Sequence, residues 1–418
     1  MRRVAVTADD YGLTRAVTDT VLEAVDCGAL TRVSILANGF VFDYAVAEYM
    51  KRQDRLEIGV HVNLTEGRPL TRAPLLTDAN GFFRYTPQGL LAVYFFSFPA
   101  ARAAIYAAIQ AEVEAQVEKV QTALGGHAIA VDGHQHIHVI PFVLDVLLDM
   151  HARSRFAHIR IPYEHFALVF GRIGAYFGKG MFRFLALNAL SHRAKERVRA
   201  VGIPHNDSFI GTLFSGRLSV DVVAEALALS RGVVEIGTHP GSADRQELSG
   251  WSGDVAWHYS PWRQYERNML ASADFRETLA AYVAGGLSPR TDVRRVVKFV
   301  LSGTGAALVH ISILYMLTEY FGLWYIASAT VGWIIAFFVS FALQRFWTFG
   351  DRPSRAGHVL QYGLLQAGNI VLNALGVAIL TEYLSLWYIA SQVVVIGLVA
   401  AWTYAASSRI IFAHAAAR

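Results

Sequence analysis

Acidic and imidazole side chains follow several predicted β-strands of this sequence, and their types suit the binding of a metal ion. Asp9 and Asp10 come after the apolar run 4–6, separated from it by two residues. Histidines follow three further predicted strands: His61 in EIGVHV, His134, His136 and His138 after AIAVD, and His239 after VVEIGT. A single histidine is usually structural. Four segments that deliver such groups to one sheet edge indicate instead a site for a divalent ion.

The chemistry of such a site explains why acids and imidazoles occur together. One carboxylate and two imidazoles can hold a divalent ion and leave positions open for water and substrate. The ion would polarise a carbonyl group and lower the pKa of a water molecule. A second carboxylate could take the proton of that water, and a further histidine could protonate a leaving amine. Adjacent acids such as Asp9 and Asp10 can divide these roles.

These side chains need a scaffold that brings strand ends together, and the first 290 residues predict one. Strands are expected over 3–7, 32–36, 57–62, 128–132, 158–161 and 233–238, and helices over 14–27, 42–51 and 101–124. The alternation predicts an α/β fold with a parallel sheet, either open or closed into a barrel. In both forms the functional residues gather at the carboxyl ends of the strands.

Four motifs of this part carry a family resemblance. TADDYGLT, GVHVNLTEGRPL, DGHQHIHVIP and IGTHPG occur in this order within residues 2–285. They resemble the YdjC/ChbG-like carbohydrate deacetylases, which include hopanoid-associated deacetylases. The resemblance implies a distorted (β/α) barrel over residues 1–288 and metal-dependent removal of an N-acetyl group from a sugar.

The same resemblance implies roles for single residues. Asp10, His61 and His134 would be the metal ligands, Asp9 the catalytic base, and His239 the proton donor or oxyanion partner. The family favours Mg²⁺, although an Asp-His-His set also suits Zn²⁺.

Further polar residues are candidates for support or substrate contact. His136 and His138 would share the face of His134 in an extended segment, and His138 also in a helical one, so the ligand among the three stays open. Asn206 and Asp207, in HNDSFIG, are expected to close the site. The apolar segment 163–202 is interrupted by basic residues and predicts an amphipathic stretch at a membrane surface, or a helix packed on the barrel.

The second part of the chain has a different composition. Overall 54% of the residues are hydrophobic and only 17% are charged, with a mean hydropathy of +0.34. The excess lies in four segments without Asp, Glu, Lys or Arg: 299–318, 323–343, 359–381 and 384–408. Each has roughly the 20 residues that a membrane-crossing helix needs. An all-α domain over 289–418 is therefore expected, with four transmembrane helices at about 297–318, 323–343, 359–381 and 384–408.

The basic residues predict an orientation for these helices. They precede the first segment, separate the second from the third and follow the fourth, whereas the other two connections carry only Glu319 and Glu382. This places both ends of the chain, and the enzyme domain, on the cytoplasmic side of the inner (plasma) membrane. The N-terminal residues lack the pattern of a signal peptide, which favours the same location. Because the basic residues cluster near the membrane segments, no nucleic-acid partner is expected.

A repeat and a second resemblance describe this membrane part. LTEYFGLWYIAS (317–328) recurs as LTEYLSLWYIAS (380–391), so two helix pairs of the same orientation are expected. KFVLSGTGAALV (298–309), QRFWTF (344–349) and the four-span layout resemble the GtrA-like family over 293–413. That resemblance implies handling of polyprenyl-phosphate-linked sugars in surface polysaccharide synthesis, with glycosyltransferases as partners. A homodimer is expected, because four helices make a small transport path.

The two parts together predict a deacetylase at the cytoplasmic membrane face that acts on a lipid-linked N-acetylated amino sugar. The lipid would be of the polyprenyl-phosphate or hopanoid type, and the membrane domain would hold or translocate it. Two alternatives are open. The chain could be a flippase or transport subunit whose barrel only binds sugar. It could also deacetylate soluble chito-oligosaccharides and use the membrane part as a plain anchor.

Overall fold

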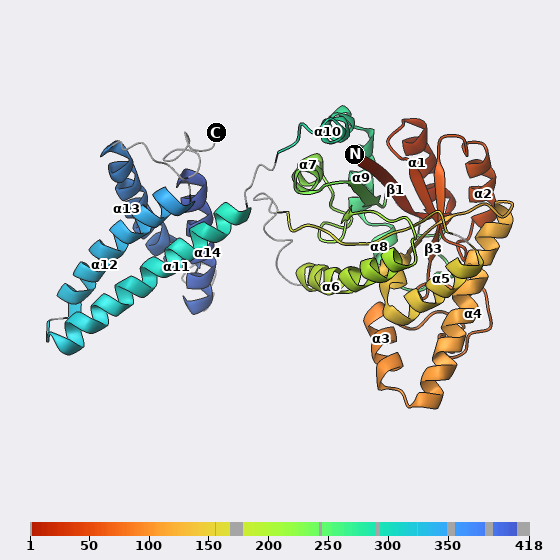
Figure 1. The fold of residues 1–418 in the computed structure, drawn as a ribbon, viewed down its shortest axis with the longest axis horizontal. Helices are drawn as coiled ribbons and strands as arrows, with labels where there is room; N and C mark the ends of the chain where they lie inside the picture. The colour runs from red at the N-terminus through yellow and green to blue at the C-terminus, as the bar shows by residue number, and fades with distance from the viewer. Residues whose placement is uncertain are drawn as a thin grey trace. The chain divides into compact units, whose positions relative to one another are not determined.

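The computed structural model describes residues 2–154, 156–167, 179–241, 245–288, 293–323, 325–348, 356–380 and 388–407. The chain divides into two compact units, Met1–Arg290 and Thr291–Arg418. Figure 1 shows the elements of each unit, and each unit is described by itself below.

The first unit is built on a sheet of seven parallel strands in the order β5-β4-β3-β2-β1-β7-β6. The strands are β1 (Arg3–Tyr11), β2 (Arg32–Ile35), β3 (Glu57–Val62), β4 (Ala130–Gly133), β5 (His158–Ile159), β6 (Ser208–Ile210) and β7 (Val233–Thr238). The sequence predicts six of them. It misses β6, which has only 3 residues and therefore too short a pattern to recognise.

The sheet is curled, and its edge strands meet. Ile159 of β5 forms an isolated parallel bridge with His205, just before β6. The amide of Phe209 also donates to the carbonyl oxygen of Tyr163 at 2.7 Å. The predicted α/β class is thus confirmed in the form of a curled parallel sheet. Its edges join through one bridge and loop contacts, because β5 and β6 are too short for a continuous ladder.

Ten α-helices and one 3-10 helix, η1 (His134–Val139), are described in this unit, and Figure 1 shows the α-helices arranged around the strands. They are α1 (Arg15–Asp26), α2 (Phe42–Met50), α3 (Pro87–Phe96), α4 (Pro99–Ala123), α5 (Pro141–Arg153), α6 (Lys179–Ala200), α7 (Val220–Leu229), α8 (Val255–His258), α9 (Pro261–Ala271) and α10 (Ala273–Val283). Several begin with proline, whose fixed φ suits the first helical turn. Since helices cover the strands, strand residues such as Val33, Val60, Val131 and Ile236 are fully buried.

The segment 163–202 is predicted to be either amphipathic or a packed helix. Helix α6 forms most of its described part, and residues 168–178 lie outside the described residues. Phe184, Leu187 and Val198 of α6 are buried, so the helix packs on the first unit along one face. Phe182 and Leu185 remain exposed on the same helix. The packed helix, one of the two predicted alternatives, is therefore present, and it also offers apolar groups to its surroundings.

The second unit consists of helices at the four predicted positions. They are α11 (Val293–Tyr315), α12 (Tyr325–Ala342), α13 (Ala356–Ala378) and α14 (Tyr388–Ala406), with the π-helical turns η3 (Met316–Tyr320) and η4 (Leu343–Thr348) after α11 and α12. Helix α11 packs on α12, and α13 packs on α14, as the repeat predicts. Across the part of the chain that the structure describes, no helix combines the length and apolar character needed to cross a bilayer.

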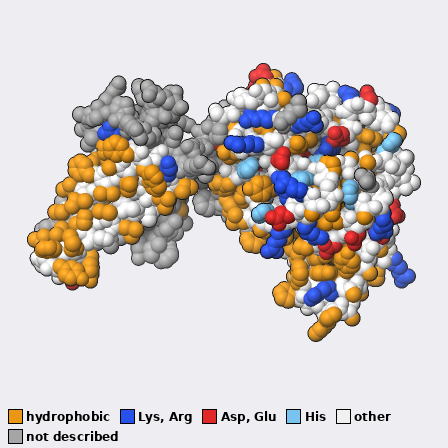
Figure 2. All heavy atoms as spheres, in the orientation of Figure 1, with side chains coloured by type: hydrophobic (Ala, Val, Ile, Leu, Met, Phe, Trp, Pro, Cys, Tyr) orange, Lys and Arg blue, Asp and Glu red, His pale blue; other side chains and the backbone are white. Residues whose placement is uncertain are grey.

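Polar side chains connect the helices inside this unit. The hydroxyl of Tyr362 on α13 is buried and accepts hydrogen bonds from Gln344 Nε2 at 2.7 Å and Gln366 Nε2 at 2.9 Å. Asn369 Nδ2 donates to Thr403 Oγ1 on α14 at 2.8 Å. Exposed side chains include Leu301, Leu308, Phe338, Leu364, Leu375 and Trp402. Figure 2 shows hydrophobic side chains over much of the visible face of this unit. Its buried side chains include apolar groups such as Phe341 and Val395 as well as the polar groups above.

Candidate active site

The two adjacent acids lie on an irregular end of β1. Asp10 has a left-handed φ of 60°, which is uncommon for a residue other than glycine. The register of β1 with β2 shifts between Ala8 and Tyr11. In a regular strand, neighbouring side chains point to opposite faces, but a bulge re-aims them. As a result the two neighbours reach different partners at the same sheet edge.

Asp10, His61 and His134 form a group that could hold a metal ion. One ligand atom from each of these buried residues lies within 4.8 Å of the others. Asp10 Oδ1 is 3.7 Å from His61 Nε2 and 3.2 Å from His134 Nδ1. Among the described residues, neither Asp10 Oδ1 nor His61 Nε2 has a hydrogen-bond partner. Buried polar atoms without partners are rare and costly, and a cation between them would satisfy both.

Each of these histidines has a carboxylate at its other ring nitrogen. His61 Nδ1 donates to Asp132 Oδ1 at 2.6 Å, which leaves Nε2 as the atom free to bind a cation. His134 Nε2 lies 3.4 Å from Glu66 Oε1, and His134 Nδ1 faces Asp10. Outer carboxylates of this kind fix the orientation of metal-binding imidazoles. The donor set therefore fits a divalent ion.

Two other groups of acids and histidines are equally compact, but their carboxylates already have hydrogen-bond partners in the protein. They are Glu66 with His134 and His258, and Asp9 with His61 and Asp132. Glu66 accepts hydrogen bonds from His258 Nε2 at 2.8 Å, from Trp251 Nε1 at 3.1 Å and from the Asp254 amide at 3.1 Å. Asp132 accepts from Ser34 and pairs with Arg160. Hydrogen bonds from protein groups thus occupy these carboxylates, whereas Asp10 Oδ1 accepts none among the described residues.

The electrostatics around Asp10 favour positive charge. Burial by itself would raise the pKa of Asp10, but Arg263, His134 and His258 hold it well below its usual range. Arg263 Nη1 donates to Asp10 Oδ2 at 2.7 Å, so only Oδ1 remains available. Burial would lower the pKa of His134, but Glu66 and Asp10 raise it to about 10. A point that stabilises a protonated imidazole would also stabilise a cation.

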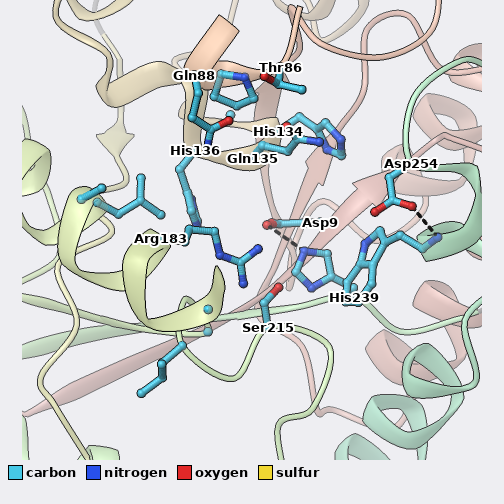
Figure 3. A pocket seen from close by; sticks show the side chains of 18 of the residues that line it. Asp9, Thr86, Gln88, His134, Gln135, His136, Arg183, Ser215, His239 and Asp254 are labelled. Atoms are coloured by element: carbon cyan, nitrogen blue, oxygen red, sulfur yellow. Dashed lines mark hydrogen bonds and ion pairs between the residues drawn. The ribbon is translucent and has the colours of Figure 1, made fainter. Parts of the chain in front are cut away.

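Asp9 is held by an arginine that the sequence analysis did not single out. Arg160 donates to both Asp9 oxygens at 2.8 Å, and it also donates to Glu235 Oε1 at 2.8 Å. The guanidinium is fully buried, so this bidentate pair fixes the plane of the Asp9 carboxylate. Asp9 Oδ2 lies 3.8 Å from His239 Nε2, and Figure 3 shows the two side chains facing each other.

His239 follows β7 and is positioned through its backbone. Its amide donates to Glu266 Oε2 at 2.7 Å. Its side chain is 17% exposed, which leaves the imidazole accessible from the neighbouring cavity. This position suits exchange of a proton with a bound molecule.

Asp9, His61, His134 and His239 line a cavity of about 810 Å³. Two helices supply further lining residues. Thr86, Gln88 and Leu91 come from the start of α3, and Phe182, Arg183 and Leu187 come from α6. Figure 3 shows several of these side chains around the opening. A cavity of this size accepts a ligand much larger than an acetyl group.

The remaining predicted residues have separate positions. His136 lines the cavity with its ring 5.2 Å from that of Phe209, and burial holds its pKa well below the usual range. His138 is buried, and its Nε2 donates to the carbonyl oxygen of Arg160 at 2.9 Å. His136 therefore can contact a ligand. His138 instead ties the turn after β4 to β5.

Asn206 and Asp207 are not brought to this cavity. The side chain of Asn206 accepts from the Ile161 amide at 2.8 Å and donates to the carbonyl oxygens of Ile161 and Ser208 at 2.7 and 2.9 Å. Asp207 Oδ2 accepts from the Val233 amide at 2.9 Å. The expectation that this pair closes the site is corrected, because both side chains are engaged by backbone groups at the edge strands.

The sequence analysis missed several residues that the site uses. Glu66 and Asp132 lie inside the quoted motifs, and Arg160 lies inside a predicted strand, so their positions at strand ends were an available signal. His258 and Arg263 belong to α8 and α9, where no motif draws attention to them. Only the folding of this late segment over the sheet edge brings them to Asp10.

Two family matches cover most of the chain. Residues 3–281 match the family described as YdjC-like protein. Residues 298–412 match the family described as GtrA/DPMS, transmembrane domain.

Similar proteins are found for the first unit. A carbohydrate deacetylase of Homo sapiens is 30% identical over 295 residues, which cover 66% of this chain and 87% of that protein. A carbohydrate deacetylase of Oceanobacillus iheyensis is 34% identical over 149 residues, covering 35% of this chain and 60% of that protein. A crystal structure from Enterococcus faecalis V583, named a putative cellobiose-phosphate cleavage protein, shares the fold with a TM-score of 0.50 and 21% identity. It covers 69% of this chain and 97% of its own.

Proposed function

Because this chain belongs to the YdjC-like protein family, we propose that its first unit is a metal-dependent carbohydrate N-deacetylase. The relatives named carbohydrate deacetylase support the reaction class. The observation that carries the proposal is the different surroundings of two adjacent acids. Asp10 shares a cation-sized group with His61 and His134, whereas Asp9 faces His239. One carboxylate is thus available for an ion and the other for a proton.

The geometry suggests a division of labour for hydrolysis of the acetamide. When bound by Asp10, His61 and His134, a divalent ion would polarise the acetyl carbonyl and lower the pKa of the attacking water. Asp9, oriented by Arg160, takes a proton from this water as its oxygen bonds to the carbonyl carbon. His239 donates a proton to the amide nitrogen as the carbon–nitrogen bond breaks. The products are acetate and a free amino sugar.

A pair of substitutions tests the two roles. Asp10→Asn should lose the bound metal, because the ligand atom Oδ1 no longer carries charge. Asp9→Asn should keep the metal and lower kcat by roughly 10² to 10⁴-fold, the usual worth of a general base. The measurements are metal content by mass spectrometry and acetate release by the purified full chain. Full turnover by Asp9→Asn would show that Asp9 is not the base. An unchanged metal content in Asp10→Asn would show that Asp10 is not a ligand.

The same preparation tests the identity of the ion. We favour Mg²⁺ from the family resemblance, while the two imidazoles also suit Zn²⁺. The chain should be stripped with a chelator and titrated with each metal. Recovery with Mg²⁺ supports the first assignment, and recovery with Zn²⁺ alone supports the second.

We further propose that the substrate is an N-acetylated amino sugar linked to a membrane lipid, of the polyprenyl-phosphate or hopanoid type. The match of the second unit to a transmembrane domain supports a location at the inner (plasma) membrane. Its exposed apolar side chains, and the hydrogen bonds between its buried polar ones, suit a lipid environment. Arg183 in the cavity wall donates to the carbonyl oxygen of Thr212 at 2.8 Å, and its positive charge suits an anionic group of the substrate.

The arrangement at the membrane is part of this proposal. The second unit holds or translocates the lipid-linked sugar, and both ends of the chain are cytoplasmic by the distribution of basic residues. The bilayer, a second copy of the chain and glycosyltransferases of surface polysaccharide synthesis are the proposed partners. Nucleic acid is not among them.

A substrate class other than lipid-linked sugar has one observation in its favour. A cavity of about 810 Å³ also accommodates more than one sugar unit, which suits a soluble chito-oligosaccharide with the second unit as a plain anchor. A flippase or transport subunit whose first unit only binds sugar remains the other alternative. It predicts sugar binding without acetate release by the full chain.

A further inference from the structure

Helices α3 and α4 form a hairpin whose tip exposes three phenylalanines. Phe95, Phe96 and Phe98 are 52%, 90% and 86% exposed, and they lie within four consecutive residues. Pro99 and Ala100 continue the exposed surface into α4. Figure 2 shows hydrophobic side chains at the end of this hairpin. A contiguous group of exposed aromatic side chains is rare on proteins that contact only water.

The structure holds these side chains in place. Arg102 of α4 donates to the carbonyl oxygens of Tyr94, Phe95 and Ser97 at 3.0, 2.8 and 3.2 Å. It thus satisfies two of the last carbonyl groups of α3 and that of the residue after it. The ring of Tyr94 stacks on that of Phe142 with centroids 4.0 Å apart. The tip is therefore an ordered turn that holds the phenylalanines at the surface, and not a frayed helix end.

The charge of the hairpin around its tip favours one kind of partner. Residues 79–111 contain no Asp or Glu, whereas they include Arg84 and Arg102. The nearest acids along the chain are Asp78 and Glu112. An apolar aromatic tip with positive charge only suits a bilayer with anionic head groups.

The other end of the same helix leads to the candidate active site. Thr86, Pro87, Gln88 and Leu91 line the cavity, and Phe95 and Phe96 end the helix. The ten residues of α3 span about 15 Å, so the tip and the cavity wall are between about one turn and two and a half turns apart. A membrane that holds the tip would bring its surface close to the cavity opening.

We propose that the α3–α4 tip inserts into the bilayer and docks the first unit on the membrane surface. Phe95, Phe96 and Phe98 enter the interface between head groups and acyl chains, and Arg102 lies at the level of the head groups. The docked unit receives substrate from the membrane surface and not from bulk water. This proposal rests on the proposed membrane association of the second unit. It does not require that the first unit is a deacetylase.

Fluorescence of labelled single-cysteine chains tests the docking. The native Cys27 is replaced by serine, and Phe96→Cys is labelled with an environment-sensitive fluorophore in the full chain. Glu118→Cys, exposed near the other end of α4, is the matched control. Both chains are reconstituted in phosphatidylcholine–phosphatidylglycerol vesicles, and co-flotation with the vesicles is checked first. The label at position 96 should shift to the blue and be quenched by spin-labelled acyl chains, whereas the label at 118 should do neither.

Each other outcome overturns the docking. If the protein co-floats but the label at position 96 keeps a water-like spectrum, the tip does not insert. This outcome has no bearing on the deacetylase proposal. A blue shift without quenching by acyl chains means that protein covers the tip, either from a second copy or from the same chain. A chain that does not co-float removes the membrane association together with the docking. Acetate release from a water-soluble substrate by Phe96→Cys, measured in parallel, reports on the deacetylase separately.

Discussion

At the scale of single residues, the chemistry of this site depends on what lies beyond the first contacts. Asp9 and Asp10 are identical side chains one position apart. Arg160 holds both oxygens of Asp9, whereas Arg263 holds only one oxygen of Asp10. The remaining oxygen of Asp10 lies among imidazoles. The partner groups, and not the residue type, assign the two tasks.

The carboxylates behind the histidines should control metal affinity. Asp132→Asn and Glu66→Gln should each weaken metal binding by roughly 10 to 100-fold, because the imidazoles lose the acceptors that orient them. Glu112→Gln is the control, since this buried carboxylate binds the amides of Leu70 and Thr71 outside the cavity. Isothermal titration with the preferred metal gives the dissociation constants. Equal constants for all three variants and the wild type would contradict the support role.

His138 should make the first unit lose stability in mild acid. Burial lowers its folded-state pKa to about 4, below the ordinary value of 6.5. Between pH 4 and 6.5 the unfolded chain binds the extra proton. The stabilisation is therefore complete above pH 6.5 and is lost as the pH falls to 4, by about 3 kcal/mol. His138→Gln can still donate to the Arg160 carbonyl and should flatten this part of the profile. Hydrogen exchange of β4 and β5 against pH measures it, and parallel profiles for both chains would refute the assignment.

At the scale of elements, one side chain adds to the backbone contacts that close the curled sheet. Asn206 makes three hydrogen bonds to backbone groups of Ile161 and Ser208, next to the short strands β5 and β6. The short strands supply few ladder bonds of their own. The residue first considered for the substrate site therefore serves the scaffold that carries Arg160.

Asn206→Ala should destabilise the first unit by about 2 to 3 kcal/mol, because the buried Ile161 amide loses its acceptor. Acetate release per folded molecule should change little. Asn80→Ala, at an exposed position, should change the stability by less than about 0.5 kcal/mol. Thermal unfolding and initial rates separate the two effects. A large drop in rate without a loss of stability would restore the predicted role in substrate binding.

At the scale of the whole molecule, a unit of the YdjC-like family and a helical unit that matches a transmembrane domain share one chain. If the second unit holds the substrate lipid, the covalent link raises the effective concentration of substrate at the first unit. The benefit would apply only to substrates in the same membrane.

Residues 1–288 alone should therefore match the full chain on a soluble N-acetylated oligosaccharide. On a lipid-linked amino sugar in vesicles, residues 1–288 should be slower than the full chain by at least about 10²-fold. This factor is the lower end of the gain that a covalent link gives. Mass spectrometry of the sugar and acetate assays give the rates, with full-length Asp9→Asn as the inactive control. Equal rates on the lipid-linked sugar would favour a plain anchor. Sugar binding without turnover by either form would favour the transport alternative.

The sequence by itself determined the α/β class, the helical second unit and the group of Asp9, Asp10, His61, His134 and His239. These features depend on local patterns: hydrophobic periodicity, strand ends and short motifs that each lie within a few residues. Parallel strands place their carboxyl ends at one edge, so residues far apart in sequence could be grouped without a structure.

Only the tertiary structure decided which partner each group has. Arg160, His258 and Arg263 approach the acids from segments 151, 248 and 253 positions along the chain from Asp9 or Asp10, and no local pattern encodes such distances. The same holds for Asn206, whose polar side chain fits a substrate contact equally well until its backbone partners are known. The exposure of the α3–α4 tip is likewise a property of packing. An apolar run reads as core in a sequence, and its position at the end of a hairpin decides that it faces outward.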